Sequence, residues 1–293
     1  MNEVLRVEGL EKNYGKFALK DVTFSVPEGC IAGFVGANGA GKTTTIRAMM
    51  NLISRESGSV EILGMDMAAQ ETEVKNRLGV VSDNGYYYGG FTLDEMKSIL
   101  ARAYKNWDNQ VYARLLQRFS LDRKQKLETL SRGMKMKFAL TLAMSHHAEF
   151  LIMDEPSSGL DMVTRAQVMD SLKEYMEKEG RGVLFSTHIA SDIERAADMV
   201  ILIDKGRIVF QEDKDMLLER FRLVKGDGKL LDRETEGLLL GVEKNRFGFS
   251  AITEHADEIK RRLPDIVLER TGIEEILMAY MEKGEDAHDS RIA

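Results

Sequence analysis

The chain has 293 residues, of which 43% are hydrophobic and 30% are charged. At roughly 100 to 200 residues per domain, this length indicates one main domain with a smaller second unit, and the apolar share excludes a wholly disordered chain. Lys and Arg number 41 against 48 Asp and Glu, so the net charge of −7 disfavours nonspecific nucleic-acid binding through a general positive field. The single cysteine, Cys30, excludes an internal disulfide framework and a cysteine-based zinc site, and we expect it to be a small buried residue.

The sequence also bears on location. It has no run of about 20 apolar residues, which a helix needs to cross a bilayer. Residues 1–10 carry Glu3, Arg6 and Glu8, unlike the uninterrupted apolar region of a secretory signal. We therefore expect a cytoplasmic chain without a membrane span.

The first two thirds of the chain predict alternating strands and helices. Strands are expected at 4–7, 18–26, 30–35, 150–153, 183–186 and 199–204. Helices are expected at 42–53, at 93–119 with a break near 106–109, and at 131–147, 161–179 and 191–197. This alternation predicts an α/β fold with a largely parallel sheet, preceded by a β-rich opening section.

After residue 211 the pattern changes to that of a small α+β unit. A charged helix is expected at 214–222, strands at 238–244, 247–253 and 266–269, and further helices at 256–263 and 273–283. The last residues, 284–293, are polar and predict a flexible tail. The predicted domains are therefore residues 1–211, with a helical subdomain at about 84–147, then residues 212–283 and the tail.

Residues 36–43, Gly-Ala-Asn-Gly-Ala-Gly-Lys-Thr, fit the pattern G-x-x-x-x-G-K-[ST] between a predicted strand and a predicted helix, which is the context of a P-loop. Glycines let successive N–H groups turn toward phosphate oxygens, and the helix start adds its positive dipole end. A glycine-rich turn without a ligand is the alternative, and the flanking strand and helix disfavour it. The predicted ATP-binding residues are Gly36, Asn38, Gly39, Ala40, Gly41, Lys42, Thr43 and Thr44, with Lys42 on the β- and γ-phosphates and the Thr43 hydroxyl on Mg²⁺.

An acidic pair follows the predicted buried strand at 150–153. Asp154 is expected to hold Mg²⁺ through its water shell, because Mg²⁺ keeps several waters and binds few protein carboxylates. Glu155 is placed as the general base that polarises the water attacking the γ-phosphate. An apolar strand followed by Asp-Glu is a weak signal alone, but beside a P-loop it predicts nucleotide hydrolysis.

Together these residues resemble one family, the ATP-binding cassette (ABC) ATPases, over residues 1 to about 210. Leu-Ser-Arg-Gly-Met at 130–134 resembles the family's Leu-Ser-Gly-Gly-Gln signature, and Ser-Gly-Leu-Asp at 158–161 resembles its D-loop. His188, at a strand end, resembles the switch histidine, and Tyr14 is placed where the family stacks an aromatic ring on adenine. The resemblance implies a P-loop ATPase fold with a parallel-sheet core, an antiparallel β subdomain and a helical subdomain.

The resemblance also implies how the site is completed. In this family two cassettes face each other, and the signature of one binds the γ-phosphate held on the P-loop of the other. Ser131, Gly133 and Asp161 would then contact nucleotide across the dimer, while His188 would contact the γ-phosphate and orient the attacking water. Read without the P-loop, Ser131 would be an ordinary helix N-cap and His188 an ordinary strand-end histidine.

Two departures from the family pattern stand out. Arg132 replaces the first signature glycine and Met134 the glutamine, and Arg132 is expected to add charge facing the nucleotide or a partner. The Q-loop glutamine, which in the family touches Mg²⁺ and the membrane partner, aligns with Asp83. Asp83 can ligate Mg²⁺, and Asn84 is the alternative. The tyrosines at 86–88 that follow predict either a partner contact or local packing on the helical subdomain.

The function that this resemblance implies is an ATP-binding and ATP-hydrolysing subunit of an ABC transporter. It would dimerise on ATP with an identical or a different ATP-binding subunit and drive a separate membrane permease, most resembling bacterial multidrug or antibiotic exporters. The alternative is a non-transport ABC ATPase acting in translation or DNA maintenance. A single P-loop, the short interval from Lys42 to Ser131 and the acidic charge disfavour it, and predict no nucleic-acid partner. A cassette that binds but does not hydrolyse ATP is disfavoured by Glu155 and His188.

Overall fold

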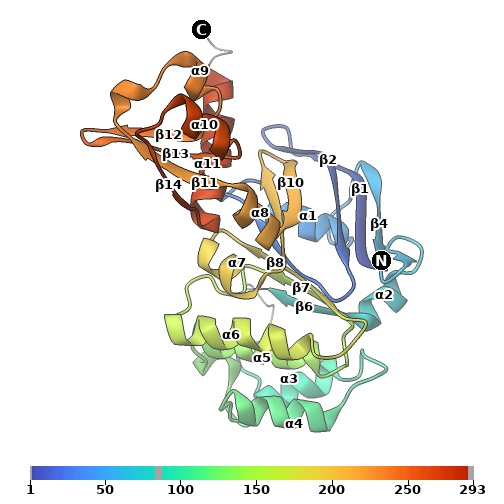
Figure 1. Ribbon diagram of the computed structural model, residues 1–293. Helices are drawn as coiled ribbons and strands as arrows, with labels where there is room; N and C mark the ends of the chain where they lie inside the picture. The colour runs from blue at the N-terminus through green and yellow to red at the C-terminus, as the bar shows by residue number, and fades with distance from the viewer. Residues whose placement is uncertain (1, 83–87, 290–293) are drawn as a thin grey trace.

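The computed structural model describes residues 2–82 and 88–289, with side chains described as far as residue 281. Figure 1 shows three parts arranged around a central sheet: an antiparallel sheet on one side, a group of helices at the bottom of the view, and the C-terminal extension at the top left. No helix in these two segments is long and apolar enough to cross a membrane.

The strands are β1 (Glu3–Asn13), β2 (Ala18–Pro27), β3 (Ile31–Val35), β4 (Ser57–Ile62), β5 (Met65–Asp66), β6 (Leu78–Ser82), β7 (Phe150–Asp154), β8 (Gly182–Thr187), β9 (Met199–Asp204), β10 (Arg207–Asp213), β11 (Arg222–Gly226), β12 (Leu240–Asn245), β13 (Gly248–Thr253) and β14 (Val267–Arg270). The α-helices are α1 (Lys42–Met49), α2 (Glu71–Arg77), α3 (Leu93–Leu100), α4 (Asn109–Arg118), α5 (Arg132–Met144), α6 (Met162–Tyr175), α7 (Ala190–Ala196), α8 (Lys214–Arg220), α9 (Arg233–Glu236), α10 (Ala256–Arg262) and α11 (Ile273–Asp289). Short 3₁₀ turns lie at Leu127–Thr129 and Gly228–Leu230.

The central sheet has the strand order β10-β9-β3-β8-β7-β6, with β10 antiparallel to β9 and the other neighbours parallel. All five residues of β3 are buried, as expected for a strand covered on both faces. Because parallel strands end at the same edge, the segments that follow β3, β7 and β8 meet there. This edge positions the candidate site.

Successive residues of these strands face two different cores. Ile152 and Leu184 pack with α1 and the antiparallel sheet, whose strand order is β2-β1-β4-β5. Met153 and Phe185 pack with α5, α6 and α7 on the opposite face. The α/β fold predicted from the sequence, with an antiparallel β subdomain on one side and helices on the other, is thus present.

The helical part contains α3, α4 and α5, and the predicted break in the helix at 93–119 is confirmed. Thr92 caps α3 in a reciprocal capping box with Glu95, and Asp108 caps α4 by accepting from two backbone N–H groups. Tyr88, 68% exposed, packs its ring 5.4 Å from that of Phe91. Asp83, Asn84, Tyr86 and Tyr87, on which the Q-loop and partner predictions rest, lie outside the described residues.

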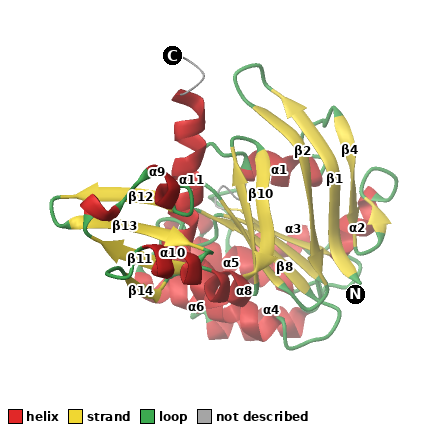
Figure 2. Cartoon of the chain, turned by 45° about the horizontal axis from the view of Figure 1, so that its top comes forward, coloured by secondary structure: helices red, strands yellow, loops and turns green. Residues whose placement is uncertain are grey.

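The C-terminal extension has its own antiparallel sheet, in the order β12-β13-β11-β14, and a small core that includes Val224, Phe249 and Ile259. Its helices α8 and α11 instead join the large core of the first domain through residues such as Phe221 and Ile276. Figure 2 shows this sheet standing apart from the other two. The extension is thus a separate small layer attached through two helices.

Several element predictions need correction. The predicted boundary after residue 211 falls inside β10, which ends at Asp213, and the helix expected at 214–222 ends at Arg220. Arg222 instead starts β11, and its guanidinium donates to the carbonyls of Leu218, Glu219 and Phe221 at the end of α8. Helix α11 continues to Asp289, into the segment expected to be a tail, since glycine at 284 is tolerated within a helix. Cys30 is half-buried rather than buried.

Strands β4, β5, β6, β10 and β11 and helices α2 and α9 were not predicted. The sequence of β4, Ser-Gly-Ser-Val-Glu-Ile, begins like a loop and gains its strand form from pairing with β1 and β5. β10 is the edge strand of the central sheet and mixes charged with apolar residues. Tertiary pairing, which local pattern does not reveal, determines these strands.

Candidate functional site

A cavity of about 680 Å³ lies at the carboxyl edge of the central sheet, within the size range of small-molecule sites. Asn38, Gly39, Gly41, Lys42, Thr43 and Thr44 line it, together with Asp154, Glu155 and His188. Gly36 and Ala40 lie behind the loop: a Cβ at Gly36 would overlap the carbonyl oxygen of Ile203, and Ala40 is 4% exposed. The fold therefore brings the predicted P-loop, the acidic pair and the histidine to one cavity.

The P-loop follows directly from local sequence. β3 ends at Val35, and α1 begins at Lys42 with Gly41 as its N-cap at φ 117°, a left-handed conformation that favours glycine. A Cβ at Gly41 would lie 2.9 Å from Leu19 and 3.0 Å from Phe17. The loop can therefore pass beneath these side chains and direct the start of α1 into the cavity, where a helix N-terminus favours anions.

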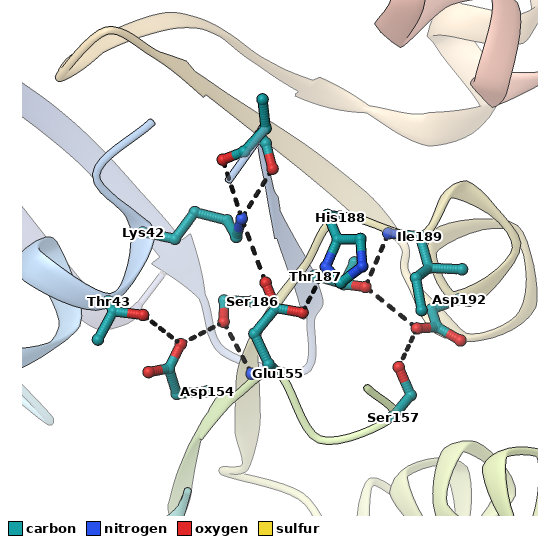
Figure 3. A network of polar contacts seen from close by, with 12 residues as sticks. Lys42, Thr43, Asp154, Glu155, Ser157, Ser186, Thr187, His188, Ile189 and Asp192 are labelled. Atoms are coloured by element: carbon teal, nitrogen blue, oxygen red, sulfur yellow. Dashed lines mark hydrogen bonds and ion pairs between the residues drawn. The ribbon is translucent and has the colours of Figure 1, made fainter. Parts of the chain in front are cut away.

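Lys42 is 5% exposed, and its three ammonium hydrogens each have an acceptor nearby. Nζ donates to the carbonyl oxygens of Gly36 at 2.7 Å and Ala37 at 3.2 Å, and lies 3.2 Å from Glu155 Oε1. Figure 3 shows the ammonium between the loop carbonyls and Glu155. A phosphate entering the cavity would offer Lys42 stronger, charged acceptors than these carbonyls.

Asp154 ends β7 and is held by two hydroxyl groups. Its Oδ1 accepts from Ser186 Oγ at 2.6 Å and from Thr43 Oγ1 at 3.2 Å, which joins β7 to β8 and to α1. The donor set of Thr43 and Asp154 fits Mg²⁺, which prefers hard oxygen ligands and keeps several of its waters. Across residues 2–82 and 88–281 no cluster of three His, Cys, Asp or Glu side chains forms a fuller metal cage.

Glu155 contacts two cationic or titratable groups at once. Oε1 faces Lys42, and Oε2 lies 2.8 Å from His188 Nδ1 (Figure 3). The backbone of Glu155 has φ 51°, a left-handed value uncommon outside glycine, and its N–H donates to Ser186 Oγ at 2.9 Å. The turn after β7 thus directs the carboxylate across the cavity toward the end of β8.

Two aromatic residues, Tyr14 and Phe17, lie on the turn near the cavity. Tyr14 lies on the turn between β1 and β2, is 54% exposed and has Lys12 Nζ 5.4 Å from its ring centroid. Phe17, three residues later on the same turn, lines the cavity. Sequence reasoning missed Phe17 because only the folded turn shows which of the two rings faces the P-loop. The adenine-stacking role of Tyr14 stays a prediction.

Comparisons with known proteins add to this geometry. Residues 19–158 match the family model described as ABC transporter. The chain is 35% identical over 208 residues to the uncharacterized ABC transporter ATP-binding protein YdbJ of Bacillus subtilis, covering 70% of this chain and 68% of that protein. It is 30% identical over 223 residues to the linearmycin resistance ATP-binding protein LnrL of the same organism, covering 74% and 71%.

A solved structure described as the ATP binding subunit of an ABC transporter superposes on the chain with a TM-score of 0.67 at 29% identity. The superposed region covers 74% of this chain and 92% of the chain in that structure. The chain belongs to the ABC transporter ATP-binding proteins. It is thus an ATPase subunit of an ABC transporter, as the resemblance predicted, and none of these matches favours a role in translation or DNA maintenance.

In this ABC subunit the residues expected to contact nucleotide across a dimer, Ser131 and Gly133 of the signature and Asp161 of the D-loop, do not line the cavity of their own chain. Ser131 caps α5 by accepting from the N–H of Met134 at 3.2 Å, and Asp161 caps α6 by accepting from the N–H of Thr164 at 2.9 Å. A Cβ at Gly133 would lie 2.8 Å from Thr164 Cγ2, so the two helix starts pack together. None of Ser131, Gly133 and Asp161 is among the residues that line the cavity.

Arg132 is exposed and has a close neighbour within its own chain, and its expected charge toward the nucleotide or a partner stays a prediction. A Cβ at Gly159 would overlap its guanidinium, and Gly159 has φ 66°. Arg132 therefore packs against the D-loop of its own chain. The sequence could not show this, because the contact joins the start of α5 to a loop that precedes α6.

Proposed function

We propose that this chain hydrolyses ATP to power an exporter, by binding a second ATP-binding subunit across ATP and driving a membrane permease on another chain. The observation that carries the proposal is the set of contacts around one cavity, in which Lys42, Glu155 and His188 form a continuous chain beside Thr43 and Asp154. These are the phosphate-binding, base and magnesium positions of phosphoryl-transfer sites.

The chemistry follows from those contacts. The γ-phosphate of ATP draws Lys42 away from the carbonyls of Gly36 and Ala37, and the P-loop N–H groups bind the remaining phosphate oxygens. This releases Glu155 Oε1 from Lys42 and lets it accept the proton of the attacking water. His188, on the other carboxylate oxygen, holds Glu155 in place and faces the transferred phosphoryl group. Mg²⁺ bound at Thr43 and Asp154 supplies positive charge that offsets charge developing on the phosphates.

Binding of a second subunit would explain why the signature residues do not line the ATP cavity of their own chain. Ser131 and the N–H of Gly133 form a helix start able to bind a γ-phosphate, yet they do not line their own cavity. Next to Asp161, Met162 is 85% and Val163 67% exposed, an apolar pair beside the D-loop. A second ATP-binding subunit, identical or different, would cover this pair and place its own P-loop against the signature.

The membrane permease has a candidate docking groove. A cavity of about 410 Å³ runs between the end of α1 and β6, lined mainly by apolar side chains, with Leu52 59% and Val80 42% exposed. Ser82 and Asp154 line both this groove and the cavity at the P-loop, so the groove lies beside the ATP site. We assign it to a short apolar helix of the permease, which places this subunit at the cytoplasmic face of the membrane. The linearmycin resistance relative supports export, because an exporter gives resistance by removing the compound.

Glu155→Gln tests the proposal. The amide keeps the side-chain shape but does not accept the water proton, so ATP turnover should fall by about 10²- to 10⁴-fold while ATP binding remains. Size-exclusion chromatography with ATP should then show a stable dimer that the wild type forms only transiently. Glu243→Gln, an exposed position on β12, is the matched control and should behave as the wild type. A Glu155→Gln chain that turns over ATP at the wild-type rate and stays monomeric would refute the proposal.

A further inference from the structure

Asp192 is a buried carboxylate that lies behind the ATP site without lining it. It is on α7 and is 1% exposed. Burying a carboxylate is unfavourable unless hydrogen bonds and a counter-charge compensate for the lost hydration. The groups that surround Asp192 therefore indicate what its carboxylate does in the fold.

Two hydroxyl groups donate to the same oxygen of this carboxylate. Ser157 Oγ and Thr187 Oγ1 both bond to Asp192 Oδ2, the latter at 3.1 Å (Figure 3). Ser157 stands two residues after Glu155, and Thr187 immediately precedes His188. The carboxylate thus joins the two loops that carry the proposed base and the proposed water-orienting residue.

The same group shapes the turn around His188. Thr187 Oγ1, besides donating to Asp192, accepts from the N–H of Ile189 at 3.0 Å, so the residues on both sides of His188 are tied to one hydroxyl. On the cavity side, His188 Nδ1 meets Glu155 Oε2 at 2.8 Å. The two loops are therefore linked twice, at the front through Glu155 and His188 and behind through Asp192.

A third segment supplies the counter-charge. Arg165 Nε, on α6, lies 3.7 Å from Asp192 Oδ1, and Arg165 Nη1 donates to Ser191 Oγ at 3.4 Å. Helix α6 starts at the D-loop, with Asp161 as its cap. Asp192 consequently contacts the loop after β7, the end of β8 and the helix that follows the D-loop.

We propose that Asp192 is a positioning residue for ATP hydrolysis, which fixes Glu155 and His188 relative to each other through Ser157 and Thr187. This rests on the proposed roles of Glu155 and His188. The competing explanation is a purely structural one, in which an acidic residue in the first turn of α7 stabilises that helix. That explanation predicts lower stability with unchanged catalysis, so kinetics separate the two.

The experiment measures steady-state ATP hydrolysis by the full-length chain with Mg²⁺. Asp192→Ala should lower kcat by about 10- to 100-fold with KM for ATP within about 3-fold, because the positioned pair acts in the transition state rather than in ATP binding. Asp192→Asn, whose amide oxygen still accepts from both hydroxyls, should recover about half of that loss on a logarithmic scale.

The chain offers a matched control. Asp170 on α6 pairs with Arg195 on α7 at 2.8 Å, so it joins the same two helices but is half exposed and distant from the cavity lining. Asp170→Ala should keep wild-type kcat and KM. Equal kinetics for Asp192→Ala and Asp170→Ala would overturn the proposal.

A double variant tests whether Asp192 acts on ATP hydrolysis through His188. If Asp192 acts through His188, adding Asp192→Ala to His188→Ala should change the single-turnover rate by less than about 3-fold. A full multiplicative loss in that background overturns the proposal. Should Asp192→Ala fail to fold, Ser157→Ala and Thr187→Val each remove one hydroxyl donor and should each lower kcat by about 3- to 10-fold. Wild-type kcat in both overturns it as well.

These outcomes are distinguishable from failure of the proposed function. If the wild type hydrolyses ATP and His188→Ala abolishes most of that activity, the site assignment stands whatever Asp192 does. If neither holds, the proposed function itself is wrong.

Discussion

The cassette (residues 2–82 and 88–213) and the C-terminal extension (residues 214–289) differ in where their polar side chains lie. In the cassette, polar side chains from four segments converge behind and around one cavity, and Lys42 and Asp192 are almost fully buried. In the extension, charged residues form pairs at the surface, such as Lys225 with Glu269, above a small apolar core. Buried polar networks require exact partners, whereas surface pairs do not. The comparison locates the chemistry of the site in the first region.

The largest effect on ATP binding that tests this contrast is expected at Lys42. Lys42→Ala removes the charge-assisted contact with phosphate, so ATP affinity should fall by roughly 10²-fold or more. Isothermal titration calorimetry with ATP measures it. Lys20→Ala, exposed on β2, is the control and should bind as the wild type. Equal ATP affinities for the two variants would contradict the phosphate-binding role of Lys42, and the difference between the two regions would then lose its functional meaning.

The next effect concerns the junction between the regions. Phe221 is 0% exposed, at the end of α8, with its ring 6.0 Å from that of Tyr280 in an edge-on arrangement. Phe221→Ala should lower the free energy of unfolding by about 3 to 5 kcal/mol through a cavity in the large core, with ATP affinity unchanged while the chain is folded. Urea denaturation measures the loss. Phe247→Ala, 82% exposed in the extension, should stay within about 0.5 kcal/mol. A fall in ATP affinity for Phe221→Ala would show that the regions are coupled.

The smallest effect compares one surface ion pair from each region. In the cassette, Arg77 donates to both oxygens of Glu149, at 2.6 and 2.5 Å, and this hydrogen bonding lowers the pKa of the Glu149 carboxyl. A lowered pKa stabilises the fold above the unfolded value of about 4.3, and the contribution disappears as the pH falls through the folded value. Because both side chains are partly exposed, Glu149→Gln should lower the free energy of unfolding by about 1 kcal/mol at pH 7.

That difference should shrink as the pH falls below the unfolded pKa of about 4.3, and it should vanish only below the lowered pKa of the folded state, where the wild-type carboxyl is protonated too. Urea titrations at pH 7 and at acidic pH measure it. Lys225→Ala, which breaks the single contact to Glu269 in the extension, should cost less than about 0.5 kcal/mol. If Lys225→Ala lowered the free energy of unfolding more than Glu149→Gln, the stronger surface ion pair would be the one in the extension and not the one in the cassette.

The sequence predicted those parts of the site that are contiguous or stand at strand ends. The P-loop is one continuous motif, and Asp154, Glu155 and His188 follow buried strands whose carboxyl ends must meet in a parallel sheet. It predicted neither the partners of these residues nor the network around Asp192. That network depends on side chains from segments distant in sequence that point toward one another. In the sequence alone, Ser157, Thr187 and Asp192 have no feature that sets them apart from other serines, threonines and helix-start aspartates.

The same reason explains the errors in the fold. The long buried strands and capped helices were recognisable from periodicity, but β4 and β10 obtain their form from neighbouring strands. The position of Phe17 at the cavity and the contact of Arg132 with the D-loop were missed because the neighbouring glycines, Gly41 and Gly159, adjoin them only after folding. Local pattern specifies elements, whereas contacts between elements complete the site.

The left-handed backbone of Glu155 sets stability and activity against each other at that position. A non-glycine residue held at φ 51° costs about 1 to 3 kcal/mol, and glycine or asparagine would occupy the same backbone at less expense. Neither carries a carboxylate able to reach across the cavity to His188. Glu155→Gly should therefore raise the stability of the fold while it removes the proposed catalytic base, so the position that carries the chemistry is also one where the chain is less stable than it could be.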